Sequence, residues 1–215
     1  MAFMVMMVMT GCMKNGTNST VENAKPESAT TAAHASAPVD DPRYRMATFA
    51  GGCFWCMQPP FDTVAGVIRS TAGYSGGPEA DPTYERVSSG TTGHAESVQV
   101  VYDPAIVSYE HLLDIYWHNI NPTQVNGQFA DHGRQYRTAI FYHDEAQHQA
   151  ALKSKQALAG SGKFDAPIAV EITQFSAFYP AEDYHQQYYK KNYEDYHRYR
   201  IGSGREGYLQ ATWGK

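Results

Sequence analysis

Alternating apolar and polar residues predict the strands of this chain, and wider apolar spacings predict its helices. The clearest strand pattern is AESVQVVY at residues 95–102, which ends at the turn-forming pair Asp103-Pro104. Ser108 is typical of a helix cap, and the apolar spacing after it predicts a helix that continues to residue 120. Further strands are expected at 45–50, 67–74, 136–143 and 168–173, and further helices after Gly51-Gly52 and over 145–158.

The order of these elements is βαββαβ, followed by one more αβ unit and a C-terminal tail rich in aromatic residues. This order predicts an α+β fold with a ferredoxin-like, split βαβ core. We expect the aromatic-rich tail to be irregular. A chain of 215 residues is long enough for one domain whose core needs no disulfide or metal to fold.

The composition of the chain changes near residue 42. Residues 1–12 are apolar and rich in Met, and residues 13–42 are polar without an aromatic side chain, which predicts a disordered tether. Met9-Thr10-Gly11-Cys12 resembles the cleavage box of bacterial lipoproteins, although no basic residue precedes the apolar run. The segment therefore predicts lipid attachment at Cys12 and a place in the bacterial cell envelope, facing the periplasm. The alternatives are a mis-assigned start codon or an apolar tail without function, and a cytoplasmic protein.

Charge and cysteine content exclude several classes of protein. The chain has 17 basic and 22 acidic residues and a net charge of −5, so nothing indicates a nucleic-acid partner. Three cysteines are too few for a disulfide scaffold. No apolar run in the sequence approaches the roughly 20 residues of a membrane-spanning helix.

The segment Gly51-Gly52-Cys53-Phe54-Trp55-Cys56 carries the first candidate chemistry. A Cys-x-x-Cys pair at the start of a helix places its first thiol near backbone N–H groups and the positive end of the helix dipole. We therefore expect a lowered pKa and a nucleophilic thiol at Cys53, with Cys56 close enough to trap an oxidised Cys53 as a disulfide. The pair could also be half of a zinc site, but no second Cys pair or His-x-x-x-His supplies the other ligands, which favours redox chemistry without a metal.

Glu96 shares a strand face with Val98, Val100 and Tyr102, because successive side chains of a strand point to opposite faces. If this face is buried, desolvation raises the pKa of the carboxyl and keeps it protonated near neutral pH, as a proton donor requires. The alternative is that a glutamate at the end of a strand reaches solvent, and the spacing does not decide between the two.

Several separated motifs point to one protein family. They are Gly52-Cys53-Phe54-Trp55, then Gly90-Thr91-Thr92-Gly93-His94-Ala95-Glu96, then Gln128-Phe129-Ala130-Asp131 followed by Gln135-Tyr136-Arg137. Together with Phe178-Tyr179-Pro180-Ala181-Glu182 and Tyr184-His185, they resemble the peptide methionine sulfoxide reductase A family from about residue 45 to residue 213. The resemblance implies an α+β catalytic domain, placed at residues 43–215, that reduces the S epimer of methionine sulfoxide, free or in proteins.

The resemblance also implies roles for individual residues. Cys53 is then the nucleophile and Glu96 the acid, and the sulfenic acid left on Cys53 becomes an intramolecular disulfide that thioredoxin or a similar dithiol protein reduces. We expect a monomer that uses no cofactor. By the same resemblance, Phe54 and Trp55 wall the pocket for the substrate methyl group, Tyr84 and Tyr136 hydrogen-bond the sulfoxide oxygen, and Asp131 helps to hold the substrate.

Two features depart from the family pattern. Pro59-Pro60 falls in the second turn of the active-site helix, which predicts a late start or a kink and weakens the dipole argument for Cys53. Some family members carry resolving cysteines near the C-terminus, but here no cysteine follows Cys56. The resolving sulfur is therefore Cys56 or, less readily, Cys12.

Other functions and roles stay open at this point. A thioredoxin-like thiol-disulfide exchanger would use the Cys pair without a buried acid, so Glu96 separates it from a reductase. A binding module for oxidised methionine peptides would need neither thiol. The aromatic and acidic site residues also have ordinary structural alternatives, as core aromatics, unremarkable tyrosines or a loop cap. For His185 we expect only such an ordinary role, as a hydrogen-bonded helix residue.

Overall fold

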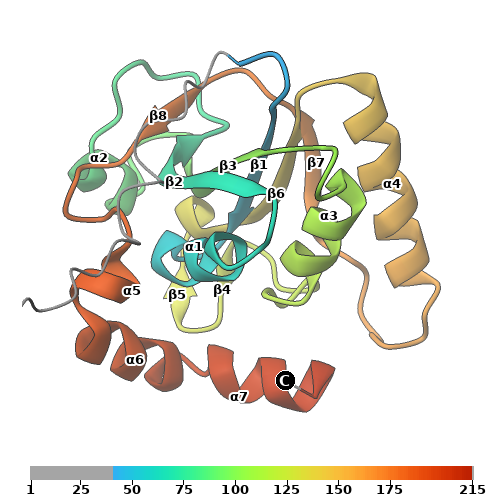
Figure 1. Ribbon diagram of the computed structural model, residues 1–215. Coiled ribbons are helices and arrows are strands. Elements are labelled where there is room, and N and C mark those ends of the chain that lie inside the picture. The colour runs from blue at the N-terminus through green and yellow to red at the C-terminus, as the bar shows by residue number, and fades with distance from the viewer. Residues whose placement is uncertain (1–40, 215) are drawn as a thin grey trace, which may run out of the picture. The chain divides into compact units, whose positions relative to one another are not determined.

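A six-stranded sheet forms the centre of the described part of the chain, residues 41–214, in this computed structural model (Figure 1). The strand order is β7-β6-β1-β3-β2-β8, with β7 parallel to β6 and the other neighbours antiparallel. Strands β4 and β5 pair as a separate hairpin. The strands are β1 (Arg45–Gly51), β2 (Val67–Ser75), β3 (Ala95–Tyr102), β4 (Gly127–Gln128), β5 (Asp131–His132), β6 (Thr138–Tyr142), β7 (Glu171–Gln174) and β8 (Phe178–Pro180).

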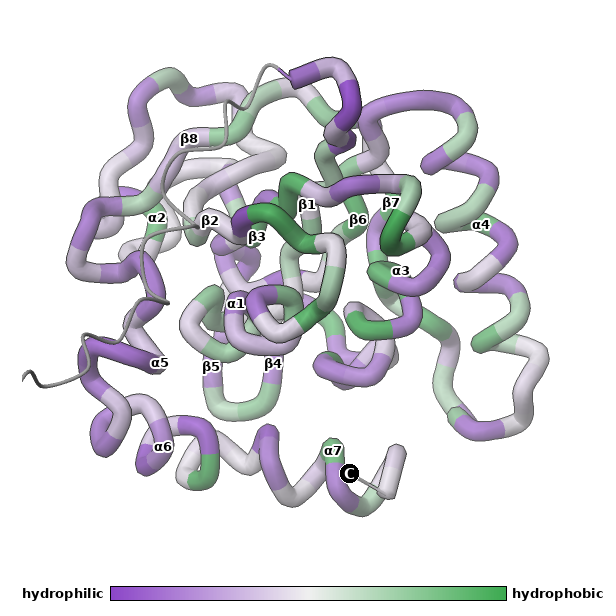
Figure 2. The backbone as a smooth tube through the Cα atoms, in the orientation of Figure 1, coloured by the Kyte–Doolittle hydropathy of each residue, from purple (hydrophilic) through white to green (hydrophobic). Residues whose placement is uncertain are grey.

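Helices α1 and α3 pack against the sheet and bury the main core with it (Figure 1). Phe49 of β1 stacks on Phe61 of α1 and on Tyr116 of α3, which joins the three elements. Figure 2 shows apolar residues concentrated on the strands and on parts of the inner helices, whereas α6 is largely hydrophilic. The helices are α1 (Phe54–Asp62), α2 (Tyr84–Ser88), α3 (Tyr109–Trp117), the 3-10 helix η1 (Arg134–Tyr136), α4 (Glu145–Ala159), α5 (Tyr188–Lys191), α6 (Tyr193–Gly202) and α7 (Arg205–Trp213).

The predicted α+β class is confirmed, and most predicted elements occur where they are expected. Strand β3 spans the predicted residues, and Ser108 caps α3 by accepting the His111 N–H. Strand β6 begins later than expected because residues 134–136 form η1. Strand β7 also begins late, because the Ala169 N–H donates to the Pro122 carbonyl instead of to a strand. Helix α2, the β4–β5 hairpin and strand β8 are additional to the prediction, and α3 ends at Trp117 instead of at residue 120.

The expectation of an irregular C-terminal tail is wrong, because residues 188–213 form α5, α6 and α7. Helix α6 buries Tyr196 and exposes most of its other side chains, so it lacks the apolar stripe by which a sequence pattern indicates a helix. Polar contacts hold the segment instead. The Tyr199 hydroxyl donates to Asp131, and Arg200 of α6 forms an ion pair with Glu206 of α7.

None of the helices between residues 41 and 214 has the length and apolar content needed to cross a membrane. The predicted lipoprotein segment, residues 1–12 with Cys12, lies outside the described residues. The same holds for nearly all of the predicted tether, residues 13–42. Both interpretations stay predictions.

Candidate active site

The two cysteines of the Cys-x-x-Cys segment lie at the start of α1, directly after β1. Gly52 has a left-handed φ of +80°, and a Cβ at this position would come within 2.5 Å of a neighbouring side chain, so the turn requires glycine. Cys53 is the N-cap of α1, and its carbonyl accepts the Cys56 N–H at 3.0 Å. Both thiols are buried and free, and each alters the pKa of the other. Helix α1 runs through Pro59 and Pro60 and begins at residue 54, so it does not start late.

The position of Glu96 shows that the predicted face of β3 is buried. Its side chain is 2% exposed, and it pairs across the sheet with Tyr74. A carboxyl oxygen accepts the Phe54 N–H at 3.0 Å, which places the acid at the first turn of α1. Burial raises the pKa of Glu96 to about 8, and the Phe54 N–H opposes the rise only in part. The acid is therefore protonated near neutral pH, and the alternative of a solvent-exposed strand end is wrong.

The structure contradicts the expectation that Cys53 has a lowered pKa. Burial raises the pKa of this thiol well above its usual value, and the hydrogen bond to Cys56 and the nearby Glu96 add to the rise. The Phe54 N–H that would stabilise a thiolate is occupied by Glu96, and the Cys53 side chain makes no capping hydrogen bond. The neighbouring Cys53 thiol and the charge of Arg205 lower the pKa of Cys56 to about 7, so Cys56 is the more acidic thiol.

Tyr84, Tyr136 and Asp131 come from three separate elements and converge near Cys53 and Glu96. Tyr84 begins α2, Tyr136 ends η1 and Asp131 begins β5. Burial raises the pKa of Tyr84 to about 12 and raises that of Tyr136 as well, and the nearby Glu96, Cys53 and Asp131 contribute to both shifts. The two hydroxyls are therefore neutral hydrogen-bond donors. The sequence-predicted site residues thus lie around one point.

Side-chain hydrogen bonds hold the two elements that carry these tyrosines. A Glu182 oxygen accepts the Tyr84 N–H at 2.9 Å, and the other accepts the Tyr74 hydroxyl at 2.8 Å, so the start of α2 is tied to β2. The Gln135 amide donates to the Ser88 carbonyl at 2.9 Å and joins η1 to α2. These partly buried polar contacts therefore hold the two elements that carry the phenol groups at a set separation.

Aromatic side chains form a wall beside the thiols. The Trp55 indole N–H donates to Nδ1 of His185 at 3.0 Å, and the Trp55 ring stacks on Tyr188 with 3.8 Å between ring centres. Phe54 is 1% exposed, and its ring centre lies 4.9 Å from that of His185. Burial lowers the pKa of His185 to about 4, so the imidazole is neutral and orients Trp55. The sequence does not indicate Tyr188. Tyr184-His185 is one of the motifs of the family resemblance, but only an ordinary structural role is expected for His185, and its contact with Trp55 is not predicted.

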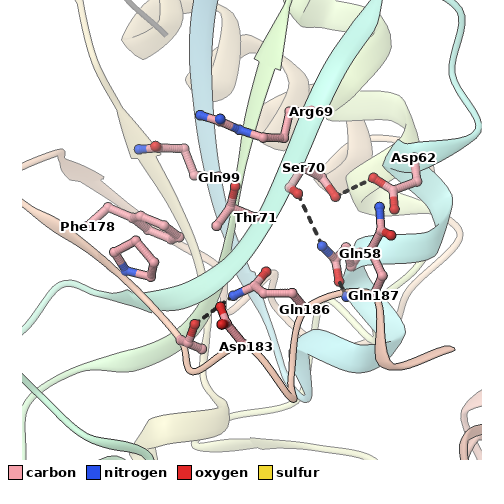
Figure 3. A pocket seen from close by; sticks show the side chains of 12 residues that line it. Gln58, Asp62, Arg69, Ser70, Thr71, Gln99, Phe178, Asp183, Gln186 and Gln187 are labelled. Atoms are coloured by element: carbon pink, nitrogen blue, oxygen red, sulfur yellow. Dashed lines mark hydrogen bonds between the residues drawn. The ribbon is translucent and has the colours of Figure 1, made fainter. Parts of the chain in front are cut away.

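A cavity of about 520 Å³ lies between α1, β2 and the segment before α5 (Figure 3). It is lined mostly by polar side chains and by none of the predicted site residues. Gln58 donates to the Ser70 carbonyl at 3.1 Å, and the Gln186 amide bonds both the N–H and the carbonyl of Ala72, at 2.9 and 2.8 Å. These bonds cover the edge of β2 and anchor the segment that carries His185.

These groups together define a thiol-dependent reductase. A buried pair of thiols can supply two electrons, and a protonated carboxyl with two phenol hydroxyls can donate a proton and hydrogen bonds to an oxygen. An aromatic wall beside them suits an apolar group next to that oxygen. Among residues 41–214, no three His, Cys, Asp or Glu side chains are grouped so as to hold a metal ion.

Comparison with known proteins identifies the family. Residues 45–215 match the family model described as "Peptide methionine sulfoxide reductase". The peptide methionine sulfoxide reductase MsrA of Bacillus licheniformis is 55% identical over 170 residues, which cover 79% of this chain and 94% of that protein. The chain belongs to the peptide methionine sulfoxide reductase family and is an oxidoreductase.

Solved structures share the mixed α+β fold. Mxr1 from Saccharomyces cerevisiae in reduced form is 33% identical with a TM-score of 0.67, and the match covers 72% of this chain and 89% of that chain. Mxr1 in complex with Trx2 is 24% identical over the matched region, with a TM-score of 0.50 and coverage of 69% and 87%. The second likeness shows the fold alone.

Proposed function

We propose that this enzyme reduces the S epimer of methionine sulfoxide, free or within proteins, to methionine. The observation that carries the proposal is the Glu96 carboxyl, protonated near neutral pH and hydrogen-bonded at the start of the helix that bears the thiols. Family membership supports the substrate class. The motif resemblance around Cys53, Glu96 and Asp131 supports the choice of the S epimer.

The chemistry needs a nucleophile at sulfur and a proton at oxygen, because the oxygen of a sulfoxide is a poor leaving group. The Cys53 sulfur attacks the sulfoxide sulfur and gives up its thiol proton, while Glu96 donates a proton to the oxygen. Tyr84 and Tyr136 donate hydrogen bonds to the same oxygen. The S–O bond of the substrate then breaks, its oxygen passes as a hydroxyl group to the Cys53 sulfur, and the transient S–S bond breaks to release methionine. The proton that Cys53 gave up restores Glu96. Cys53 is left as a sulfenic acid, so methionine gains the two electrons that Cys53 loses.

Cys56 then resolves the sulfenic acid on Cys53 to a disulfide, and a thioredoxin-type dithiol protein reduces that disulfide. The two buried cysteines are neighbours in the first turn of α1, where the Cys56 N–H donates to the Cys53 carbonyl, and this proximity supports the resolving role. The chain carries no cysteine after Cys56, and Cys12 lies outside the described residues. Yeast Mxr1, which is 33% identical to this chain in the match to its reduced form, has also been solved in complex with Trx2, and this supports the choice of reductant.

Turnover of separated S and R epimers with a dithiol tests the substrate class. We expect reduction of the S epimer and none of the R epimer, because a site built from fixed donors and one aromatic wall accepts one arrangement of oxygen and methyl group. Comparable rates on both epimers, or no reduction of the S epimer, would overturn the proposal.

Cys56→Ser tests the resolving role. The variant should form one methionine per Cys53 without a reductant, accumulate a sulfenic acid that dimedone traps, and fail to cycle with thioredoxin. Normal cycling with thioredoxin would contradict the role of Cys56. Loss of the first turnover would mean that Cys56 serves the pocket or the first chemical step.

The finer description of the fold as a ferredoxin-like, split βαβ core is also a proposal. It is supported by the order β6-β1-β3-β2 within the sheet, in which each neighbouring pair is antiparallel. Strands β1 and β2 are joined through α1 and separated by β3, as that topology requires.

Lipid attachment at Cys12 and a periplasm-facing place in the bacterial cell envelope are supported by the sequence Met9-Thr10-Gly11-Cys12. Cells that express the full chain can be labelled with a palmitate analogue, with Cys12→Ala as the matched control. A signal that depends on Cys12 is expected. Equal labelling of the two chains, or none, would leave the cytoplasmic alternative and would not touch the catalytic proposal.

A further inference from the structure

Arg205, the first residue of α7, is a buried cation whose hydrogen bonds all go to neutral groups. Its side chain is 1% exposed. It donates to the Asn119 carbonyl at 2.5 Å and to the Gly51 carbonyl at 2.9 Å, and its guanidinium lies 4.6 Å from the centre of the Phe129 ring. Among residues 41–214, the ion pairs of the arginines involve positions other than 205. Burial raises the pKa of the nearby acid Asp131 and this guanidinium opposes the rise, but the acid is hydrogen-bonded to a tyrosine of α6 and forms no ion pair with Arg205. A buried charge without a paired opposite charge is costly, so this arrangement requires an explanation.

The guanidinium lies beside the first turn of α1, where both cysteines are. Gly51 precedes Cys53 by two residues, and a Cβ at Gly52 would come within 2.8 Å of Nη2 of Arg205. Nη1 lies 3.7 Å from the sulfur of Met57. Residues 53, 56 and 57 are neighbours on one helix surface, because positions three and four apart face the same side. The positive charge therefore lies next to the pair of thiols.

We propose that Arg205 is the counter-ion that holds Cys56 as a thiolate for its attack on the oxidised Cys53. The inference rests on the proposed resolving role of Cys56. Arg205 is a positioning residue here, because it acts on the thiol through its charge and not on the substrate. In agreement, the charge of Arg205 lowers the pKa of Cys56, and only the interaction with Cys53 lowers it more.

The other charged and titratable groups around Cys56 do not replace this cation. Arg200 also favours the thiolate, but it is already paired with Glu206. Any negative charge on the neighbouring acids opposes a thiolate, and burial raises the pKa of the nearby tyrosines so that they stay neutral. The full set that faces Cys56, apart from Arg205, is Cys53, Glu96, Asp131, Tyr196, Tyr199 and Arg200.

The resolving step balances without an external oxidant. The Cys56 thiolate attacks the sulfur of the Cys53 sulfenic acid, an S–S bond forms and the S–O bond breaks. The oxygen leaves as hydroxide and takes one proton from solvent to become water. The Cys56 sulfur is oxidised by one electron and the Cys53 sulfur is reduced by one, so the pair exchanges electrons internally. A fixed positive charge raises the fraction of thiolate that starts this step.

Arg205→Gln and Arg205→Lys distinguish two roles of Arg205. It could act on Cys56 through its charge, or it could only join α7 to α1 structurally. Each enzyme is mixed with excess S-methionine sulfoxide without reductant, and quenched samples are assayed for methionine and for disulfide across the pH range. Arg205→Gln should slow methionine formation much less than disulfide formation, because Cys53 and not Cys56 is the nucleophile of the first step. It should form the disulfide roughly tenfold more slowly at neutral pH, with the pH midpoint of that step raised by about one unit. Arg205→Lys keeps the charge and should keep the wild-type midpoint.

Arg198→Gln is the matched control, because Arg198 is an exposed partner of Asp195 on α6 and should change neither step. An unchanged midpoint in Arg205→Gln, or equal slowing of both steps, would overturn the proposal and leave a structural link. If Arg205→Gln does not fold, a raised midpoint in Arg205→Lys would overturn it as well. Wild-type enzyme that forms methionine but no disulfide between Cys53 and Cys56 would instead contradict the proposed function of Cys56.

Discussion

The reacting groups and the groups that control their surroundings come from two different regions of the molecule. Cys53 and Glu96 lie on β1–α1 and β3, which are neighbours at the middle of the sheet. His185 and Arg205 belong to the C-terminal segment, residues 181–213, which passes below α1 in Figure 1. The first region supplies the atoms that react, and the second orients an aromatic wall and supplies a buried charge.

The two regions are also held in place differently. Strands β1 and β3 pair directly from Arg45 to Ala50, and the Phe54 N–H reaches Glu96, so the backbone sets the position of the acid. The C-terminal segment is attached largely through side chains, such as the Gln186 amide on the backbone of β2. Substitutions in the sheet region should therefore remove the chemical step, whereas those in the C-terminal segment should change binding or resolution.

Glu96→Gln should have the largest effect on the first chemical step. The change keeps the shape of the side chain and an acceptor for the Phe54 N–H, but it removes the proton, so methionine formation should slow by roughly 10²- to 10⁴-fold. In wild type this step should fall as pH rises through about 8, where Glu96 ionises. Single-turnover rates across pH measure both effects, with the exposed Glu110→Gln as control. A near wild-type rate would favour a thiol-disulfide exchanger.

Glu96→Gln should also change the stability of the fold, and here the variant should gain relative to wild type as the pH rises. The pKa of Glu96 is about 8 in the folded protein and about 4.3 in an unfolded chain, so its stabilising contribution is complete below the unfolded value. That contribution is lost as the pH rises through about 8. Because Gln does not ionise, the Tm of Glu96→Gln relative to wild type should rise by a few degrees from about pH 5 to pH 9. Calorimetry at both pH values checks this, and a constant difference would contradict the raised pKa.

Tyr84→Phe and Tyr136→Phe should have the next largest effects, each slowing methionine formation roughly 10- to 100-fold. Each removes one hydrogen bond to the sulfoxide oxygen, and a bond to a group that gains charge contributes about 1.5–3 kcal/mol. The rate of disulfide formation should be unchanged in both variants. Tyr44→Phe, outside the site, is the control. Equal slowing of methionine and disulfide formation would mean that the hydroxyls support the fold of α2 and η1 instead.

The sheet region could be predicted from the sequence, because its strands are short runs rich in apolar residues and bounded by turn-forming residues. Strand β3 has the predicted bounds, but its spacing left open whether Glu96 is buried, and the structure decides this because both faces of the strand are covered. The pKa of Cys53 could not be predicted in the same way. Burial of the thiol raises the pKa, and the Phe54 N–H that could oppose the rise is occupied by Glu96, a contact between residues 42 positions apart that no local pattern indicates.

The C-terminal segment could not be predicted from patterns because polar contacts order it. Helix α6 has no apolar stripe, and its Tyr199 is held by Asp131 across 68 positions of sequence. His185 is buried because Trp55 and the surrounding aromatic rings enclose it, and no periodicity marks it. Arg205 carries a charge that normally indicates an exposed position, yet it lies inside the protein.

His185→Phe should affect substrate binding more than the chemical step. Phe fills the volume but offers no acceptor to the Trp55 indole N–H, so Trp55 loses its fixed orientation. We expect a rise in KM of roughly 3- to 10-fold, the value of one neutral hydrogen bond, with kcat within about threefold of wild type. The change in KM should not vary between pH 6 and 9, because the pKa of His185 is about 4. His185→Gln, which restores an acceptor, should recover part of the loss.

Glu206→Gln should have the smallest effect. It should shift the pH midpoint of disulfide formation in the direction opposite to the shift in Arg205→Gln. The side chains of Glu206 and Arg200 are 47% and 20% exposed, so solvent screens their ion pair and its loss should cost less than about 1 kcal/mol of stability. Arg200 then faces Cys56 without a compensating charge and favours the thiolate more strongly. The pH midpoint of disulfide formation should therefore fall by a few tenths of a unit, at an unchanged rate of methionine formation.

The matched control for Glu206→Gln is Asp195→Asn, which releases Arg198 from a more exposed pair on the same helix, with side chains 75% and 64% exposed. That change should leave the midpoint where it is, because the freed charge stays in solvent. A midpoint that rises in Glu206→Gln would mean that Glu206 holds Arg200 near Cys56, so that breaking the pair moves the cation away. Opposite shifts in Glu206→Gln and Arg205→Gln, with none in Asp195→Asn, would show that the C-terminal segment acts on Cys56 through charge.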